Sequence, residues 1–211
     1  DLQVFKDWRL YGQAGDRLYL SLAREAFGLL ETREKDLSGL STPEEWERYR
    51  DSVRRRLTEA FGPLWEKTPL NPRVAGSFER QGLRVEKITF ESRPGWKVTA
   101  VLAKRPELKG KLPAVLLVCG HTADGFKGYQ QQLFNLAWRG FVVLCFDPVG
   151  QGERYQYYEP ELGRSRLGGT TSEHSYAGLQ YLLLGRTFAG VRLWDGIRAV
   201  DYLLSRPDVD P

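Results

Sequence analysis

The 211-residue chain contains no methionine, only two cysteines and only two histidines. The histidines, His121 and His174, show no H-x-x-x-H spacing, and the cysteines, Cys119 and Cys145, show no C-x-x-C spacing. We therefore expect no metal site and no cofactor. Both cysteines lie in apolar runs typical of strands, which favours buried free thiols over a disulfide. No apolar run approaches the roughly 18–20 residues that span a bilayer, so we expect no membrane anchor.

Several functional motifs are also missing. A phosphate-binding G-x-x-x-x-G-K-[S/T] does not occur, and Gly150-Gln151-Gly152 lacks the third glycine of G-x-G-x-x-G because Tyr155 stands there. The net charge of +4 is spread along the chain, and its densest basic cluster, at residues 54–56, is typical of a solvated helix face. These patterns argue against nucleotide and nucleic-acid binding. No G-x-S-x-G occurs either; the nearest imitation, residues 163–167, lacks the second glycine.

The first 75 residues are predicted to form a helical extension. Apolar residues between Leu18 and Leu30 recur at a spacing of three to four, which is typical of one helix face. A second helix is expected to begin at Pro43, with Thr42 as N-cap and Glu45 completing a capping box, and to end near Phe61. The proline-containing segment after it reads as a linker.

Residues 76–211 are predicted to form an α/β sheet with flanking helices. Leu83–Phe90 and Trp96–Ala103 flank a Pro-Gly turn and indicate a β-hairpin. The apolar runs Ala114–Cys119 and Phe141–Phe146, joined by a helix over Tyr129–Arg139, predict a parallel pair covered on both faces. A Gly- and Tyr-rich excursion follows, and then helices over about residues 174–184 and 191–204. His174 is expected in the cap region of the first of these.

One loop carries a chemical signal. Cys119-Gly120-His121-Thr122 lies at the carboxyl end of a predicted parallel strand, where open α/β sheets bind ligands. The glycine allows a sharp turn and leaves the next amide free to face a developing negative charge. A plain turn between strand and helix explains the loop alone equally well.

Four segments form a recognisable pattern: Pro113–His121, Leu136–Leu144, Asp147–Gly152 and Trp194–Asp210. This pattern resembles the N-terminal half of an α/β-hydrolase of the acetyl-xylan-esterase-like and dienelactone-hydrolase-like branch. The resemblance covers about residues 80–211, and the helices before it match the N-terminal extension of many such esterases. It implies the N-terminal portion of an α/β-hydrolase sheet, an antiparallel hairpin followed by parallel strands.

The resemblance also implies roles for single residues. The backbone amide of His121 would contribute to an oxyanion hole, although Cys119 replaces the family's usual histidine and His121 its usual aromatic residue. Gly120 and Thr122 would line the substrate site. The turn beneath it would be shaped by Asp147, Gly150, Gln151 and Gly152.

The catalytic serine, acid and histidine of such an enzyme are expected beyond Pro211. Residues 205–211 have the composition of a turn into a further strand, and the absence of a starting methionine suggests a removed leader or an excised piece. In the family's strand order, 1-2-4-3-5, the strand Ala114–Cys119 pairs with the strand that follows. We therefore expect the 211 residues alone to be inactive, and stable only beside the C-terminal half of the same domain.

As a complete protein, the expected activity is serine-dependent hydrolysis of a carboxylic ester, with a small ester or acetylated carbohydrate as substrate. Two alternatives remain open: a prolyl-oligopeptidase-like peptidase or amidase, and a non-catalytic binding domain of the same fold. The absent start, together with the family's habit of acting on polymers outside the cell, favours a periplasmic or secreted location over a cytoplasmic one.

Overall fold

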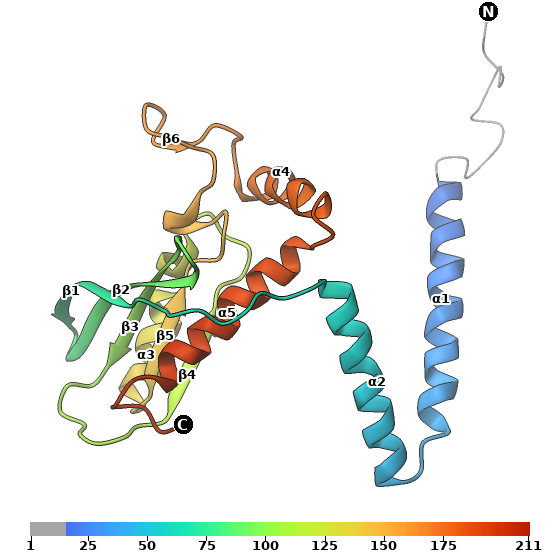
Figure 1. Ribbon diagram of the computed structural model, residues 1–211, viewed down its shortest axis with the longest axis horizontal. Coiled ribbons are helices and arrows are strands. Elements are labelled where there is room, and N and C mark those ends of the chain that lie inside the picture. The colour runs from blue at the N-terminus through green and yellow to red at the C-terminus, as the bar shows by residue number, and fades with distance from the viewer. Residues whose placement is uncertain (1–15) are drawn as a thin grey trace, which may run out of the picture. The chain divides into compact units, whose positions relative to one another are not determined.

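The computed structural model describes residues 16–211 and divides the chain into two compact units between Arg56 and Leu57. Two helices, α1 (Arg17–Ser38) and α2 (Pro43–Phe61), come first (Figure 1). The predicted domain boundary after residue 75 falls inside a strand, β1, which spans Arg73–Arg80. Sequence reasoning missed this strand because nearly all of it is exposed and its pattern does not alternate.

The start of α2 is confirmed as a capping box. The Glu45 amide donates to Thr42 Oγ1 at 3.2 Å, and the Thr42 amide donates to Glu45 Oε2 at 3.0 Å. Hydrogen bonds from the Ser41 and Thr42 amides lower the pKa of Glu45 to about 2. The helix predicted from the apolar residues between Leu18 and Leu30 also forms, as α1, but none of its residues is buried.

The second unit is built on a five-stranded mixed sheet with the order β1-β2-β3-β5-β4. The predicted hairpin and the predicted parallel pair are both confirmed: β2 pairs antiparallel with β3, and β4 pairs parallel with β5. The remaining contact, β3 with β5, is antiparallel. The strands after β1 are β2 (Leu83–Arg93), β3 (Trp96–Lys104), β4 (Ala114–Val118) and β5 (Val142–Phe146).

Helices pack on the two faces of this sheet. On one face, α3 (Gln130–Trp138) buries Leu133 and Ala137 against β2, β3 and β5. The other face is covered by α5 (Phe188–Leu204) (Figure 1). The ring of Tyr202 on this helix stacks flat on the ring of Phe90, with ring centroids 5.8 Å apart. Removal of this apolar surface from water, at about 25 cal/mol per Å², is the main force holding the layers together.

The outer edge of β4 is only partly covered in the part of the chain that the structure describes. Val118 at its end is 60% exposed. At its start, Leu112 forms a parallel bridge with Val209, where the Asp210 amide donates to the Leu112 carbonyl at 2.8 Å. Asp208, which lies between α5 and Val209, accepts hydrogen bonds from Arg206 and Lys104 that lower its pKa. The chain after α5 therefore turns to run parallel to β4, beside its open edge.

The Gly- and Tyr-rich excursion is organised around a buried carboxylate, that of Glu173. It accepts hydrogen bonds from the amides of Gln156 and Tyr157, at 2.8 and 3.1 Å, and from Ser165 Oγ at 2.5 Å. Short elements surround it: η4 (Gly152–Arg154), β6 (Tyr158–Glu159), β7 (Arg164–Ser165) and α4 (Thr170–Leu182). Because α4 begins directly after two glycines, His174 lies in its second turn, and the expectation of a cap position was wrong.

Candidate active site

The loop after β4 and the turn after β5 meet at the carboxyl ends of the two parallel strands, where Gln151 joins them. Its side-chain Nε2 donates to the carbonyls of Gly120 and Thr122, both at 2.9 Å. Its Oε1 accepts from Arg192 of α5 at 3.0 Å. Gln151 is fully buried. One side chain thus fixes the backbone of the loop relative to the sheet and to α5.

The other side of the loop is held by Tyr129, the last residue of a 3₁₀ turn, η3 (Gly125–Tyr129). The Gly120 amide donates to the tyrosine hydroxyl at 2.8 Å. A side chain at position 120 would collide with that hydroxyl. This close approach explains why the residue is glycine.

The backbone amide of His121 follows this fixed glycine. No described residue accepts a hydrogen bond from it. An amide that is held in place and has no acceptor can bind an anionic oxygen without first breaking another hydrogen bond. The role of this amide in an oxyanion hole stays a prediction. The neighbouring Thr122 is half-buried, and its hydroxyl accepts from the Asp124 amide at 3.3 Å.

Asp147 ties three elements together beneath the loop. Its carboxylate accepts from the amides of Phe126 and Glu153, at 2.8 and 3.0 Å, and from the hydroxyl of Thr99 on β3 at 2.9 Å. Burial raises the pKa of Asp147, and the hydrogen bonds oppose that rise. Gly152 lies against this carboxylate with a φ of 57°, a conformation and a spacing that exclude a side chain. These contacts of Asp147 are all structural.

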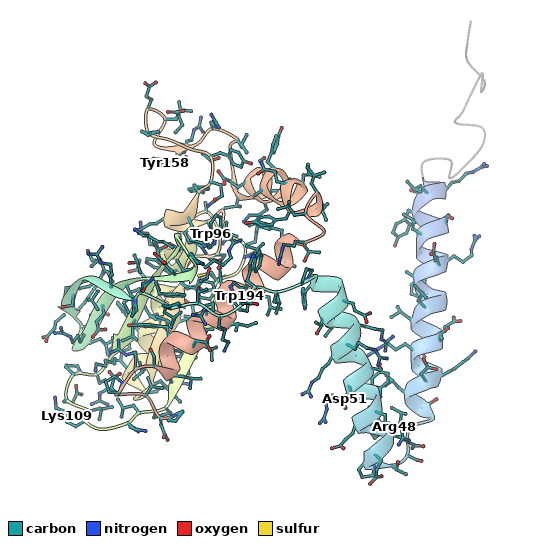
Figure 2. The ribbon with its side chains drawn as sticks, in the orientation of Figure 1. Arg48, Asp51, Trp96, Lys109, Tyr158 and Trp194 are labelled. Carbon is teal, nitrogen blue, oxygen red and sulfur yellow. The ribbon has the colours of Figure 1, made fainter. Side chains whose placement is uncertain are left out.

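A buried ion pair lies deeper in the same region. Arg154 Nη1 is 2.7 Å from Asp195 Oδ2 and also donates to the Asp147 carbonyl at 2.9 Å. The other oxygen of Asp195 accepts from Ser92 at the end of β2, at 2.6 Å. Trp194, whose indole nitrogen donates to the Ser92 carbonyl, lies on the same helix (Figure 2). The pair connects the turn after β5 to α5 and to β2.

The pairing of the two histidines could not be seen in the sequence. His121 Nε2 and His174 Nδ1 are 3.2 Å apart, and the rings meet edge to face. Burial, with smaller contributions from Arg192 and His121, lowers the pKa of His174 to about 4. His174 is therefore neutral at pH 7. Within residues 16–211, no group of three or more potential metal-ligating side chains includes this pair.

This contact leads to a prediction for the titration of His174. In an NMR titration of the complete protein, we expect its ring signals to give a pKa near 4, well below the usual value of 6.5. Between pH 4 and 6.5 the histidine then binds a proton more readily in the unfolded state than in the folded state, so acidification through this window lowers the stability of the protein. In the variant His174→Gln this loss of stability should be smaller. A pKa near 6.5 would contradict the burial of this ring.

Ser165, the serine in the nearest imitation of a nucleophile motif, is not at this site. It is 1% exposed, and its hydroxyl donates to Glu173. The cysteines are free, as predicted, with their sulfur atoms 3.5 Å apart. Cys145 is buried, whereas Cys119 is only half-buried. No helix among the described residues is long and apolar enough to cross a membrane.

Comparison with known proteins identifies the architecture. No protein-family model matches the chain. YtaP of Bacillus subtilis, assigned as a hydrolase, is 25% identical over 170 residues, which are 75% of this chain and 52% of YtaP. The structure of a protein assigned as an acetyl xylan esterase, from Bacteroides fragilis, matches with a TM-score of 0.66 and 17% identity, over 81% of this chain and 46% of that one. A methylesterase matches with a TM-score of 0.58 and 25% identity, over 81% of this chain and 35% of that one.

The chain therefore spans about half the length of the curated relative it matches. Its mixed sheet, with helices on both faces, is the N-terminal half of an α/β-hydrolase fold, as predicted.

Proposed function

We propose that this chain supplies the oxyanion half of the active site of a serine carboxylic-ester hydrolase. The observation that carries the proposal is the His121 amide, which has no acceptor among the described residues and is held at the end of β4 by Gln151 and Tyr129. The esterases among the structural matches support the reaction class. The proposed substrates are small esters, including acetylated carbohydrate, with Gly120 and Thr122 lining the acyl site.

In the proposed reaction, a serine oxygen bonds to the carbonyl carbon of the ester and loses its proton to a histidine base. The carbonyl π electrons move onto the oxygen, which becomes negative. The His121 amide donates a hydrogen bond to that oxygen, together with the amide that follows the serine. When the carbonyl re-forms, the alcohol leaves with the proton from the base, and water later releases the acid.

The sheet suggests where the serine lies. Val209 pairs with Leu112 in parallel, directly beside the path into β4. A strand that continued in this register would reach the level of Gly120 about eight residues after Val209. We propose that this strand completes the sheet and carries the nucleophile. The C-terminal half of the domain would then be the obligatory partner of this chain, which would be inactive and prone to aggregate on its own. A periplasmic or secreted location is also proposed.

Labelling with a fluorophosphonate, together with hydrolysis of p-nitrophenyl acetate, tests this function. We expect the complete protein to be labelled on one serine and to hydrolyse the ester, and residues 1–211 alone to do neither. Labelling of residues 1–211 would place the nucleophile in this chain and contradict the proposal. Faster cleavage of a peptide anilide than of the ester would favour the peptidase alternative, and no labelling of the complete protein would favour a non-catalytic domain.

A further inference from the structure

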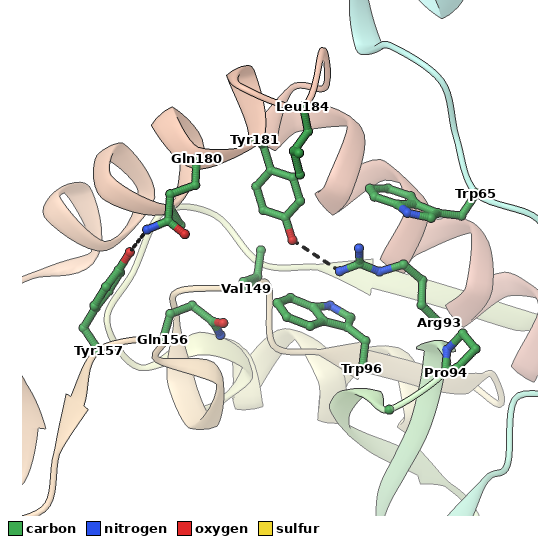
Figure 3. A pocket seen from close by; sticks show the side chains of 12 residues that line it. Trp65, Arg93, Pro94, Trp96, Val149, Gln156, Tyr157, Gln180, Tyr181 and Leu184 are labelled. Carbon is green, nitrogen blue, oxygen red and sulfur yellow. Dashed lines mark hydrogen bonds between the residues drawn. The ribbon is translucent and has the colours of Figure 1, made fainter.

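An aromatic cavity of about 730 Å³ lies beside the proposed active site, within the size range of small-molecule pockets. Trp96 from the start of β3, Tyr157 from the excursion and Tyr181 from α4 line it, together with Trp65 (Figure 3). Val149 also lines it, two residues before the Gln151 that holds the oxyanion loop. The turn that carries Gln151 therefore also forms part of the wall of this cavity.

The charged group of the cavity is Arg93, which is fixed between two indole rings. Its guanidinium lies 4.3 Å from the ring centre of Trp65 and 4.5 Å from that of Trp96. Arg186 also stacks on Trp65, at 4.2 Å. Stacking on aromatic faces sets the plane of a guanidinium and leaves its N–H groups to point outward from the edge.

Among the described residues, no carboxylate forms an ion pair with this arginine. The residues that line the cavity include Arg93 and neither aspartate nor glutamate. Within residues 16–211, the polar contact of the Arg93 guanidinium is with the hydroxyl of Tyr181, at 3.3 Å. A guanidinium carries five N–H donors and a permanent positive charge. Several donors and a full charge thus remain for a ligand.

Side-chain amides border the aromatic walls. Gln156 and Gln180 donate through Nε2 to the Arg154 carbonyl and to the Tyr157 hydroxyl, at 2.8 and 2.7 Å. No described residue donates to either amide oxygen. These oxygens can accept hydrogen bonds from hydroxyl groups. The cavity thus offers flat aromatic faces, amide oxygens that can accept from hydroxyl groups, and a guanidinium with no carboxylate partner among the described residues. Together these groups match a sugar ring that bears a carboxylate.

We propose that this cavity binds an acidic saccharide, with the carboxylate of a uronic acid on the edge of Arg93 and the pyranose ring against the aromatic walls. The planar fork of arginine fits a carboxylate with two parallel hydrogen bonds. The inference adds a substrate class to the proposed ester hydrolase. It rests on that proposed function only where it connects saccharide binding to ester hydrolysis. The binding itself depends on the cavity alone.

Calorimetric or NMR titration of the complete protein with D-glucuronate and with D-glucose tests the proposal, because these sugars differ at one carbon. Hydrogen bonds to a charged group are stronger than those between neutral groups, so glucuronate should bind at least about tenfold more tightly than glucose. Arg93→Gln should abolish this preference. Arg139→Gln, which changes an exposed arginine at the end of α3, should keep it.

Equal affinity for the two sugars, no binding of either, or a preference that survives in Arg93→Gln would overturn the proposal. If Arg93→Gln strongly lowers the unfolding midpoint, Arg93→Lys is tested in its place. Lysine keeps the charge but lacks the planar fork, so the preference for glucuronate should fall. An unchanged preference in Arg93→Lys would contradict the proposal. Neither sugar contains an ester, so binding is scored separately from turnover. If the complete protein binds glucuronate but does not hydrolyse p-nitrophenyl acetate, the result counts against the proposed function and not against the saccharide site.

Discussion

Replacement of Asp195 by alanine is expected to lower the free energy of unfolding by about 3–5 kcal/mol, because it leaves a buried positive charge without its partner. Asp195 and Arg154 are 1% and 5% exposed. The alanine variant also removes the acceptor of the Ser92 hydroxyl. Denaturant unfolding of the complete protein, followed by a probe of the hydrolase domain, measures the change.

Two matched variants make this result specific. Glu107→Ala removes one partner of an exposed ion pair with Arg105 and should change stability by about 1 kcal/mol or less. The double variant Arg154→Met, Asp195→Leu removes both charges and should recover much of the loss. A loss below about 1 kcal/mol for Asp195→Ala would show that water reaches this pair and that it does not hold the turn after β5 to α5.

Replacement of Gln151 by alanine is expected to lower kcat for p-nitrophenyl acetate about a hundredfold, with a much smaller change in KM. The variant removes the hydrogen bonds to the Gly120 and Thr122 carbonyls, which fix the His121 amide between them. A displacement of about 1 Å in a catalytic group can cost about a hundredfold in rate. The measurement is steady-state kinetics on the complete protein.

Gln130→Ala is the matched control, since the side chain of this exposed glutamine donates to the Lys127 carbonyl and not to the loop. Its kcat should stay within about threefold of the original value. If Gln151→Ala also stays within that range while remaining folded, the loop does not depend on Gln151. A large rise in KM with unchanged kcat would instead indicate a role in substrate binding.

The elements predicted correctly are those whose signals are local. The capping box at Thr42 and Glu45 lies within one helical turn, and the β2–β3 hairpin has its turn residues between two strands. The parallel pair followed from two apolar runs, because a strand buried on both faces has little room for polar residues. β1 was missed since an exposed strand next to a proline-containing segment has neither alternation nor an apolar run.

The candidate site was only partly predictable. The loop at Gly120 was found because glycine and a polar residue end an apolar run. The contacts that hold it join distant positions: Gln151 reaches a carbonyl 31 residues away, and His174 meets His121 across 53 residues. No spacing in the sequence encodes such a meeting, because it depends on where the excursion returns to the sheet. The buried pair of Arg154 and Asp195 was missed for the same reason.

The structure of the complete protein with a phosphonate bound covalently to its catalytic serine tests the central claim most directly. The phosphonyl oxygen occupies the position of the negative oxygen in the tetrahedral intermediate. We predict that it lies about 2.7–3.1 Å from the backbone nitrogen of His121 and accepts its hydrogen bond. A phosphonyl oxygen bound by other donors, with the His121 amide more than about 4 Å away, would contradict the account.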